Sequence, residues 1–253
     1  MNIRQRLENN ELVLGAFMKS SDPAMAEVLG NSGIDFFVLD NEHVSMNKES
    51  IANIVRAAEA YNVEPIIRVM KNEASNILQA LDAGAIGVQV PNIDTPKDAK
   101  DLQDYARYKP YGKRGFSPNV RAARYGATGL QDYLKWAKEN VLVVAHIESK
   151  EGYENLDEIL KIEEINTIFI GPMDITQSFG MVGQLDDPLI KEVIKEITEK
   201  SLAAGKSVGT VCGLNAVKKY YDLGMRYMLV SNDQSTVLNF YKSVVKDVEA
   251  MCK

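Results

Sequence analysis

Short apolar runs recur along the chain at intervals that leave room for a helix between most of them. Each run is nearly continuous in apolar and β-branched residues rather than alternating, which is typical of strands buried on both faces of a parallel sheet. The eight runs are 13–18, 36–40, 65–69, 86–90, 141–147, 167–171, 207–211 and 227–231. We therefore expect eight buried strands.

The segments between these runs have helical spacing. In 47–60, four apolar residues fall at i, i+3, i+4 and i+7, and Asn47 is suited to cap the helix. The segment 188–204 opens with Pro188, a residue that fits the first turn of a helix, and its isoleucines and valine share one face. Strands that alternate with helices call for right-handed parallel crossovers.

Eight strand–helix units in 253 residues match the usual size of a (β/α)8 barrel. A doubly wound open sheet is the alternative, but no GxGxxG follows a predicted strand. No linker or change of composition marks a boundary, so residues 1–253 are predicted to be one domain. The least regular stretch, 107–127, is rich in Gly, Pro, Arg and Tyr and is interpreted as a long functional loop.

Composition narrows the class of protein. The chain has 29 Lys and Arg against 35 Asp and Glu, a net charge of −6, which disfavours nucleic acid as a partner. No apolar run approaches the roughly 18 residues of a membrane span, and the first residues lack the apolar core of a secretory signal. The two cysteines, Cys212 and Cys252, have no metal-type spacing. We expect a cytoplasmic protein without membrane or nucleic-acid partners.

Ionisable residues gather where the predicted strands end. In a barrel the carboxyl ends of the strands meet at one face, and active sites lie there. Each residue alone has an ordinary structural explanation, but four of five consecutive strand ends carry such groups, and both histidines of the chain are among them. The residues at these five strand ends are Asp40, Asn41, Glu42 and His43 after the second run, Arg68 in the third, Pro91 after the fourth, His146 and Glu148 at the fifth, and Asp174 after the sixth.

The residue types restrict the chemistry. Glu148 and Asp174, on neighbouring strands, suit a hard divalent cation that keeps positions open for water or substrate. The nearest lysines, Lys19 and Lys206, are not expected to act as Schiff-base nucleophiles. A cation, an arginine and a histidine together fit a reaction that develops charge on an oxygen, such as enolate formation.

Six stretches of the sequence, which together span most of the chain, carry a resemblance to a known family. They are LGAFMKSSDPAMAEVLGNSGIDFFVLDNEH, IIRV, ALDAGAIGVQVPNIDTPKDA, YGKRGFSPNVRAARYG, HIESKEG and IFIGPMDITQSFG. With its DxEH, RG-loop and GPxD elements in this order, the sequence resembles the HpcH/HpaI family of class II pyruvate aldolases. This family includes the 2-dehydro-3-deoxyglucarate and 4-hydroxy-2-oxoheptanedioate aldolases, and the resemblance implies a (β/α)8 TIM barrel of the phosphoenolpyruvate/pyruvate superfamily type.

The resemblance implies a metal-dependent cleavage of a 2-oxo-4-hydroxy acid into pyruvate and an aldehyde, or the reverse synthesis, through a metal-bound pyruvate enolate. It implies that His43 is the general base and that Arg68 holds the keto acid and stabilises the enolate oxygen. It also implies that Glu148 and Asp174 bind Mg, Mn or Co. Substrate contacts are implied at His146, Met173 and Asp174.

The resemblance also implies that Asp82 raises the basicity of the histidine. Asp82 is predicted at a helix end below the fourth strand, facing the floor of its own barrel, so it would reach His43 only across an oligomer contact. The hexamer of the family, a trimer of dimers with an exchanged C-terminal helix, offers such a route. As alternatives, Asp82 is a plain helix-end residue, and Asp40, three residues before His43, orients that histidine. The amphipathic stretch 233–250 suits packing on its own barrel or on a neighbour.

Three residues near the substrate depart from the family pattern. His146 stands where Gln is usual. Its possible roles are a metal ligand, an acid–base group, a substrate contact or a tolerated hydrogen-bond donor. We favour a contact with the substrate or with the residues around the metal. Met173 replaces a small residue, and Phe17 stands where Trp is common at the pocket wall. The aldehyde half of the substrate is therefore not inferable from the sequence.

Two other functions remain open at this point. One is an acyl lyase like the citrate lyase β-subunit or malyl-CoA lyase, which would need a CoA-binding extension beyond the barrel. The other is a diverged, non-catalytic ligand-binding barrel, suggested by the changes at His146 and Met173. The RG loop consists of Lys113, Arg114 and Gly115, together with Arg121 and Arg124. It suits an acidic substrate tail, a solvated loop or a subunit contact.

Overall fold

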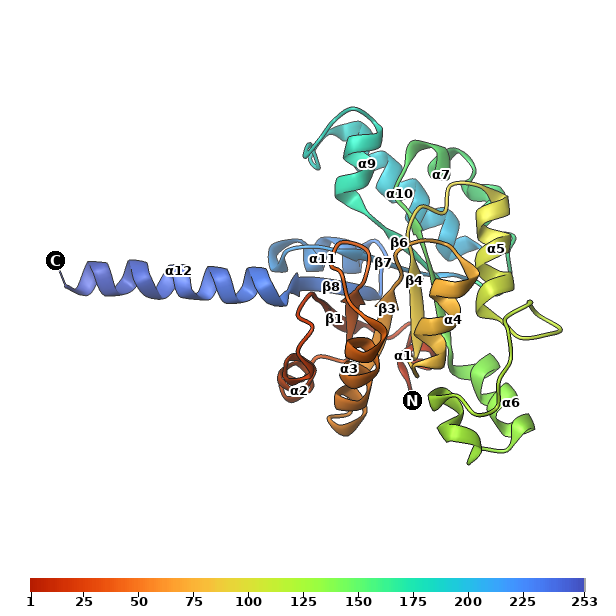
Figure 1. Ribbon diagram of the computed structural model, residues 1–253. Coiled ribbons are helices and arrows are strands. Elements are labelled where there is room, and N and C mark those ends of the chain that lie inside the picture. The colour runs from red at the N-terminus through yellow and green to blue at the C-terminus, as the bar shows by residue number, and fades with distance from the viewer. Residues whose placement is uncertain (253) are drawn as a thin grey trace.

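Within residues 1–252, which the computed structural model describes, eight parallel strands close into one barrel in sequence order (Figure 1). Strand β8 pairs with β1 to complete the ring. The (β/α)8 prediction is confirmed, and the open doubly wound sheet is excluded. The strands are β1 (Val13–Met18), β2 (Phe36–Asp40), β3 (Glu64–Arg68), β4 (Gly87–Val90), β5 (Leu142–Ile147), β6 (Thr167–Ile170), β7 (Ser207–Val211) and β8 (Tyr227–Asn232).

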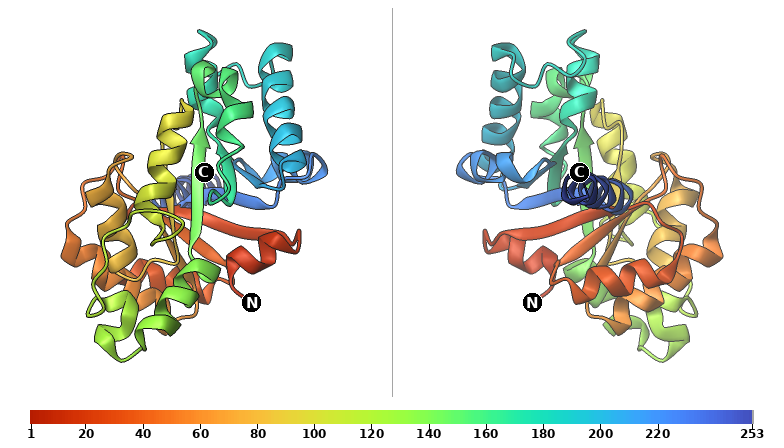
Figure 2. Two further views of the ribbon diagram at one scale, coloured as in Figure 1. Left: turned by 90° about the vertical axis from the view of Figure 1, so that its right-hand side faces the viewer. Right: turned by 90° about the vertical axis from the view of Figure 1, so that its left-hand side faces the viewer.

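Helices surround the ring and lie between consecutive strands (Figure 2). Helix α3 begins after Asn47, whose side chain accepts a hydrogen bond from the Ser50 N–H, and α10 begins at Pro188, as predicted. No helix of the described residues is long and apolar enough to cross a membrane. The helices are α1 (Ile3–Glu8), α2 (Pro23–Asn31), α3 (Lys48–Ala60), α4 (Ala74–Asp82), α5 (Pro96–Ala106), the 3-10 helix η1 (Arg121–Gly126), α6 (Leu130–Asn140), α7 (Lys150–Glu154), α8 (Leu156–Ile159), α9 (Pro172–Ser178), α10 (Pro188–Ala203), α11 (Leu214–Asp222) and α12 (Asp233–Met251).

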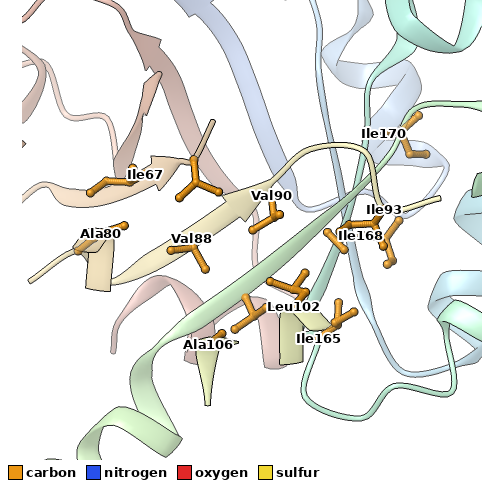
Figure 3. Packing of buried hydrophobic residues seen from close by; sticks show 14 of the residues in the cluster. Ile67, Ala80, Val88, Val90, Ile93, Leu102, Ala106, Ile165, Ile168 and Ile170 are labelled. Carbon is orange, nitrogen blue, oxygen red and sulfur yellow. The ribbon is translucent and has the colours of Figure 1, made fainter. Parts of the chain in front are cut away.

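The strands separate two apolar layers, because successive side chains point to opposite faces. Along β1, Val13 and Phe17 belong to the layer inside the barrel, whereas Met18 belongs to the layer between the strands and the helices. Figure 3 shows part of the outer layer, where Val88 and Leu102 pack together with other aliphatic side chains. Aromatic rings help to fill the inside, so the barrel is a packed core and only its mouth is free for chemistry.

The segment 107–127 lies at the amino ends of the strands, the end opposite the predicted site. Its Arg121 donates to the carbonyl of Ala83, at the end of α4. It borders a cavity of about 970 Å³ that reaches the start of β3 and is lined by Arg124, Trp136 and others. The RG-loop arginines Arg114 and Arg121 therefore lie far from any substrate held at the mouth of this barrel.

Helix α12 leaves the barrel and projects from it as a single rod (Figures 1 and 2). Among its residues Asp233 alone is buried. Its apolar side chains are largely exposed, namely Val237, Leu238, Phe240, Tyr241, Val244, Val245, Val248 and Met251. Of the two placements that the sequence left open, packing on its own barrel is therefore wrong.

Candidate active site

The ionisable residues singled out from the sequence meet at the mouth of the barrel. Asp40 is the last residue of β2 and Arg68 the last of β3, and the two are register partners. His146 lies near the end of β5, and Glu148 follows that strand directly. Asp174 lies in the first turn of α9, just after β6. Parallel strands thus bring together residues that are up to 134 positions apart in the sequence.

The Arg68 guanidinium binds two carboxylates at once. Its Nε donates to Asp40 Oδ1 at 3.1 Å and its Nη2 lies 2.8 Å from Asp40 Oδ2, while Nη1 lies 3.0 Å from Glu42 Oε2. Burial of Asp40 opposes its ionisation, but the hydrogen bond and charge of Arg68 hold the pKa of this carboxyl below its usual value. At Glu42 the effect of burial is larger than the effect of the Arg68 charge, so the pKa of that carboxyl is raised. Arg68 also lies over the Phe17 ring, 4.6 Å from its centroid.

Asp40 shapes the turn that carries His43. Its Oδ1 accepts hydrogen bonds from the backbone N–H groups of Glu42 at 3.1 Å and His43 at 3.2 Å. Asp40 therefore contacts His43 through its backbone, whereas the carboxylate within 4.0 Å of the ring is Glu42, whose Oε2 lies 3.8 Å from Nε2. That Asp40 orients the His43 side chain stays a prediction. The His43 side chain is 61% exposed and free to meet a substrate.

Glu148 is buried and held by two hydrogen bonds. Its Oε1 accepts from the Asn92 backbone N–H at 2.8 Å, and its Oε2 lies 2.8 Å from Nδ1 of His146. Burial alone would raise the pKa of Glu148, but His146, Asn92 and the charge of Arg68 outweigh burial and bring it to about 2. An ionised carboxylate only accepts, so the proton of this hydrogen bond is on His146 Nδ1.

The other ring nitrogen of His146 has no partner. The side chain is buried and stacks on Phe169, with 4.6 Å between ring centroids. Its Nε2 is enclosed and makes no hydrogen bond within residues 1–252. His146 therefore makes one side-chain hydrogen bond within these residues, from Nδ1 to the Glu148 carboxylate.

Gly171 leaves a small space between the two candidate metal ligands. A Cβ at this position would lie 2.8 Å from Glu148 Oε2 and 3.4 Å from Asp174 Oδ2, so a side chain would fill the space that both carboxylates border. Burial and the charge of Glu148 raise the pKa of Asp174, as expected when two carboxylates lie close together.

This donor set fits one kind of cation. Within residues 1–252 no three His, Cys, Asp or Glu side chains are grouped to enclose a metal ion. Two carboxylate ligands beside open space suit a hard divalent ion, such as Mg²⁺, that takes its other ligands from water and substrate. They do not form the closed cage of a structural zinc site.

Comparison with known proteins shows which family the chain resembles. The family model described as HpcH/HpaI aldolase/citrate lyase matches residues 14–238. The chain belongs to this family. It is 33% identical over 207 residues to the 2-keto-3-deoxy-L-rhamnonate aldolase of Shigella boydii, a match that covers 81% of this chain and 77% of that enzyme.

Two solved structures agree with this chain over nearly its full length. A family protein from Burkholderia cenocepacia superposes with a TM-score of 0.92 at 30% identity, covering 98% of both chains. The citrate synthase SbnG superposes with a TM-score of 0.90 at 30% identity, covering 99% of this chain and 98% of SbnG. Since its relatives include named aldolases, the chain is a carbon–carbon lyase by class. The non-catalytic alternative is therefore wrong.

Three further residues suggested by the HpcH/HpaI resemblance have different positions relative to Arg68 and Glu148. Met173 is 51% exposed in the first turn of α9, beside Asp174. Phe17 is buried beneath Arg68 and supports that guanidinium rather than forming an open wall. Asp82 lies at the end of α4, at the opposite end of the barrel, where its Oδ1 accepts a hydrogen bond from Arg114 at 2.6 Å. Its action across a subunit contact stays a prediction.

Two residues at the mouth were named from the sequence but were given no role in the site. Glu42 is part of the DxEH element, and its ion pair with Arg68 gives it a place in the site. Lys19 directly follows β1, and its Nζ lies 3.7 Å from Asp40 Oδ2. Its position one residue beyond a strand end was the signal that could have identified it.

Proposed function

We propose that the protein is a divalent-metal-dependent class II aldolase that cleaves, or forms, a 2-oxo-4-hydroxy acid, with pyruvate and an aldehyde as the other reactants. The observation that carries this proposal is that the Glu148 and Asp174 carboxylates border one small space at Gly171, at the same mouth as Arg68. The name of the rhamnonate aldolase relative supports the 2-oxo acid.

The cation would be Mg, Mn or Co, held by Glu148 and Asp174. When bound, it supplies a Lewis acid for the keto and carboxylate oxygens of a 2-oxo acid. Because the pKa of Glu148 is about 2, this ligand is ionised at neutral pH before any cation arrives. His146 fixes the orientation of the Glu148 carboxylate through its hydrogen bond, as residues that bond to metal ligands commonly do. The glutamine usual at this position in the family would also offer an N–H donor to Glu148.

Arg68 stabilises the negative charge that develops on the keto oxygen. Asp40 and Glu42 hold the guanidinium in place before the reaction, so little reorganisation is needed when the charge appears. A donor fixed in this way is typically worth about 3 kcal/mol of transition-state stabilisation.

His43 accepts the proton of the C4 hydroxyl group. The C3–C4 bond then breaks, C4 becomes the aldehyde carbon, and the electron pair forms the enolate of pyruvate. C3 of the enolate takes a proton from water, and His43 releases to water the proton that it accepted. The exposed ring of His43 can reach such a hydroxyl at the mouth, where the Glu42 carboxylate lies 3.8 Å from its Nε2.

The acyl-lyase alternative has less support, because the curated relative is named an aldolase. The citrate synthase relative keeps this alternative worth testing.

We also propose that the protein works as a homo-oligomer, a hexamer built as a trimer of dimers, in the cytoplasm. The exposed apolar side of α12 supports a second copy as its partner. In such an assembly Asp82 of one copy would approach His43 of another.

The test is deuterium exchange into the methyl group of pyruvate in D2O, followed by proton NMR with and without Mg, Mn or Co. We expect metal-dependent exchange that falls at least about 100-fold in Glu148→Gln. The matched control is Glu151→Gln, an exposed glutamate three residues later, which should exchange like the wild type. Absence of exchange from both pyruvate and 2-oxobutyrate in the folded protein, or exchange from acetyl-CoA instead, would overturn the proposal.

A further inference from the structure

Gln89 is a polar side chain inside the apolar barrel. It lies in β4 between Val88 and Val90, which face the helices, so Gln89 faces the interior. The residue is fully buried. A buried amide costs free energy unless its oxygen and its N–H groups find hydrogen-bond partners. Gln89 therefore needs partners within the barrel.

The oxygen of the Gln89 amide has a partner. The Tyr227 hydroxyl, from β8 on the opposite side of the ring of strands, donates to Oε1 at 2.8 Å. Burial keeps the pKa of Tyr227 well above its usual value, so this hydroxyl retains the proton that it donates. The amide nitrogen Nε2, in contrast, is enclosed and makes no hydrogen bond within residues 1–252. Both N–H donors of Gln89 are therefore unused.

An unused acceptor lies in the same interior. The Nδ1 of His146 donates to Glu148, so Nε2 of the neutral ring is an acceptor. This Nε2 is enclosed and has no hydrogen-bond partner in the described part of the chain. The barrel interior thus holds a buried donor and a buried acceptor that match in kind.

The topology makes Gln89 and His146 neighbours. Gln89 is the register partner of Val144 on β5, and His146 is the next inward residue of that strand. Side chains placed diagonally on adjacent strands are close enough for long residues to interact. The aromatic packing agrees, because Phe169 lies edge-on to the Tyr227 ring, with 6.1 Å between centroids, and stacks on His146 at 4.6 Å. The two free groups therefore border the same part of the interior.

Asp40 offers another buried acceptor at this end of the barrel. Its Oδ2 is enclosed and accepts no hydrogen bond of normal geometry from residues 1–252. It already lies 2.8 Å from Nη2 of Arg68 and 3.7 Å from Nζ of Lys19, so two positive charges compensate it. Nε2 of His146 has no such compensation, so it gains more from a donor on Gln89.

We propose that Gln89 is a positioning residue: one enclosed water molecule accepts from its Nε2 and donates to Nε2 of His146, which keeps that ring turned towards Glu148. A buried polar site between two such groups suits a water with two or more hydrogen-bond partners. The inference rests on the proposed function, in which Glu148 binds the cation.

The hydrogen bonds of this chain all run in one direction. Tyr227 donates to Gln89, and Gln89 donates to the water. The water donates to His146, which donates to Glu148. Hydrogen bonds ordered in this way strengthen one another. The arrangement also accounts for a histidine at this position, because the glutamine usual in the family has no second ring nitrogen that needs a donor.

The first measurement is the 15N NMR spectrum of the histidine rings in the metal-free protein. The chain has two histidines, so His146→Phe assigns their signals. Gln89→Leu replaces the amide by an apolar side chain of similar volume. We expect it to move the Nε2 resonance of His146 downfield, because that nitrogen loses its donor, while Nδ1 stays protonated.

The second measurement is the dissociation constant for Mn²⁺, obtained by electron paramagnetic resonance. We expect Gln89→Leu to raise this constant about 3- to 10-fold. In the His146→Phe background the same change should alter it less than about twofold, because the water link acts through His146. A Gln89 that served packing alone would weaken Mn²⁺ binding equally in both backgrounds.

Two further variants control for packing. Ile66→Val changes the interior on β3 without touching a hydrogen bond, and should leave both measurements as in the wild type. Gln89→Leu combined with Tyr227→Phe leaves no hydroxyl without its acceptor, so it keeps the test possible if the single variant does not fold. The double variant should show the same Nε2 shift and the same loss of Mn²⁺ affinity.

A folded Gln89→Leu with the wild-type Nε2 resonance overturns the inference, and so does an equal rise in the Mn²⁺ constant with and without His146. The wild type distinguishes these failures from failure of the proposed function. If the wild type binds Mn²⁺ and exchanges pyruvate, the Gln89 inference fails alone. If it does neither, the proposed function fails, and the inference fails with it.

Discussion

The Arg68 guanidinium contacts three side chains that come from two strand ends, those of β1 and β2. It contacts Asp40 and Glu42 and covers the ring of Phe17. Asp40 is fully buried, so its charge depends on this partner. The same side chain therefore serves both the fold and the chemistry, and the two contributions can be separated.

We predict that Arg68→Met lowers the free energy of unfolding by about 3 kcal/mol, because it leaves a buried carboxylate without its main partner. Adding Asp40→Asn should restore most of that loss, while pyruvate exchange stays about 100-fold below the wild type. Urea unfolding and the exchange assay measure the two effects. A single variant as stable as the wild type would contradict the role of the ion pair.

His146 allows a second prediction. His146→Gln keeps an N–H donor for Glu148 and should leave the dissociation constant for Mn²⁺ within about threefold of the wild type. His146→Phe keeps an aromatic ring against Phe169 but loses the donor, and should raise that constant about 10- to 100-fold. Titration of free Mn²⁺ by electron paramagnetic resonance gives both values. Equal binding by the Phe variant would mean that the hydrogen bond does not position Glu148.

The pKa of Glu148 predicts how stability depends on pH. The pKa of this carboxyl is about 2 in the folded protein, against 4.5 for an unperturbed glutamate, so folding favours the ionised form. The resulting stability, about 3 kcal/mol, is fully present above pH 4.5 and is lost as the pH falls towards 2. Urea unfolding in EDTA across this range should show that loss in the wild type and a shallower one in Glu148→Gln. Parallel curves would contradict the prediction.

At the scale of an element, α12 departs from the pattern of the other helices. Helices such as α3 and α10 bury a stripe of apolar residues against the barrel, but α12 has its apolar residues exposed along a helix that projects outward (Figure 1). Burial of that surface stabilises a helix only if another molecule supplies the covering side chains.

We predict that Phe240→Glu with Val244→Glu converts the proposed oligomer into a smaller species, because both charges would enter the covered interface. Lys246→Glu, on the polar side of the same helix, is the control and should leave the mass unchanged. Size-exclusion chromatography with light scattering reports the mass. A double variant with the wild-type mass would show that α12 is not the contact between copies.

At the scale of the whole molecule, stability and chemistry occupy opposite ends of the barrel. At the amino end, Arg107 is buried, with Nη1 donating to the Val141 carbonyl at 2.9 Å and Nη2 to the Glu164 carbonyl at 3.0 Å. Its Nε lies 3.0 Å from Glu164 Oε2. Burial lowers the pKa of Arg107 to about 10, which reflects how far this charge has been removed from water.

We predict that Arg107→Met lowers the free energy of unfolding by about 3 to 5 kcal/mol, because Glu164 loses a buried partner. Pyruvate exchange by the folded variant at 25 °C should stay near the wild-type rate, since the site is at the other end. Arg56→Met, an exposed change on α3, serves as the control and should cost less than about 0.5 kcal/mol. A folded Arg107→Met with strongly reduced exchange would contradict this separation.

The sequence by itself determined the strands and the order in which they close. Runs such as 36–40 and 207–211 match β2 and β7 residue for residue, because strands buried on both faces are continuously apolar and are bounded by turns. Once eight strand–helix units are given, the barrel brings Arg68, Glu148 and Asp174 to one end. For that reason the main candidate site followed from sequence positions alone.

The tertiary structure decided what each of these side chains contacts. The sequence did not show that Asp40 reaches His43 through its backbone, that Phe17 lies under Arg68, or that Lys19 lies beside Asp40. It also did not show that α12 leaves the barrel, since an amphipathic stripe specifies that a surface must be covered but not by which chain. Apolar periodicity is local along the chain, whereas ion pairs and helix partners depend on distances between residues that only the closed barrel brings together.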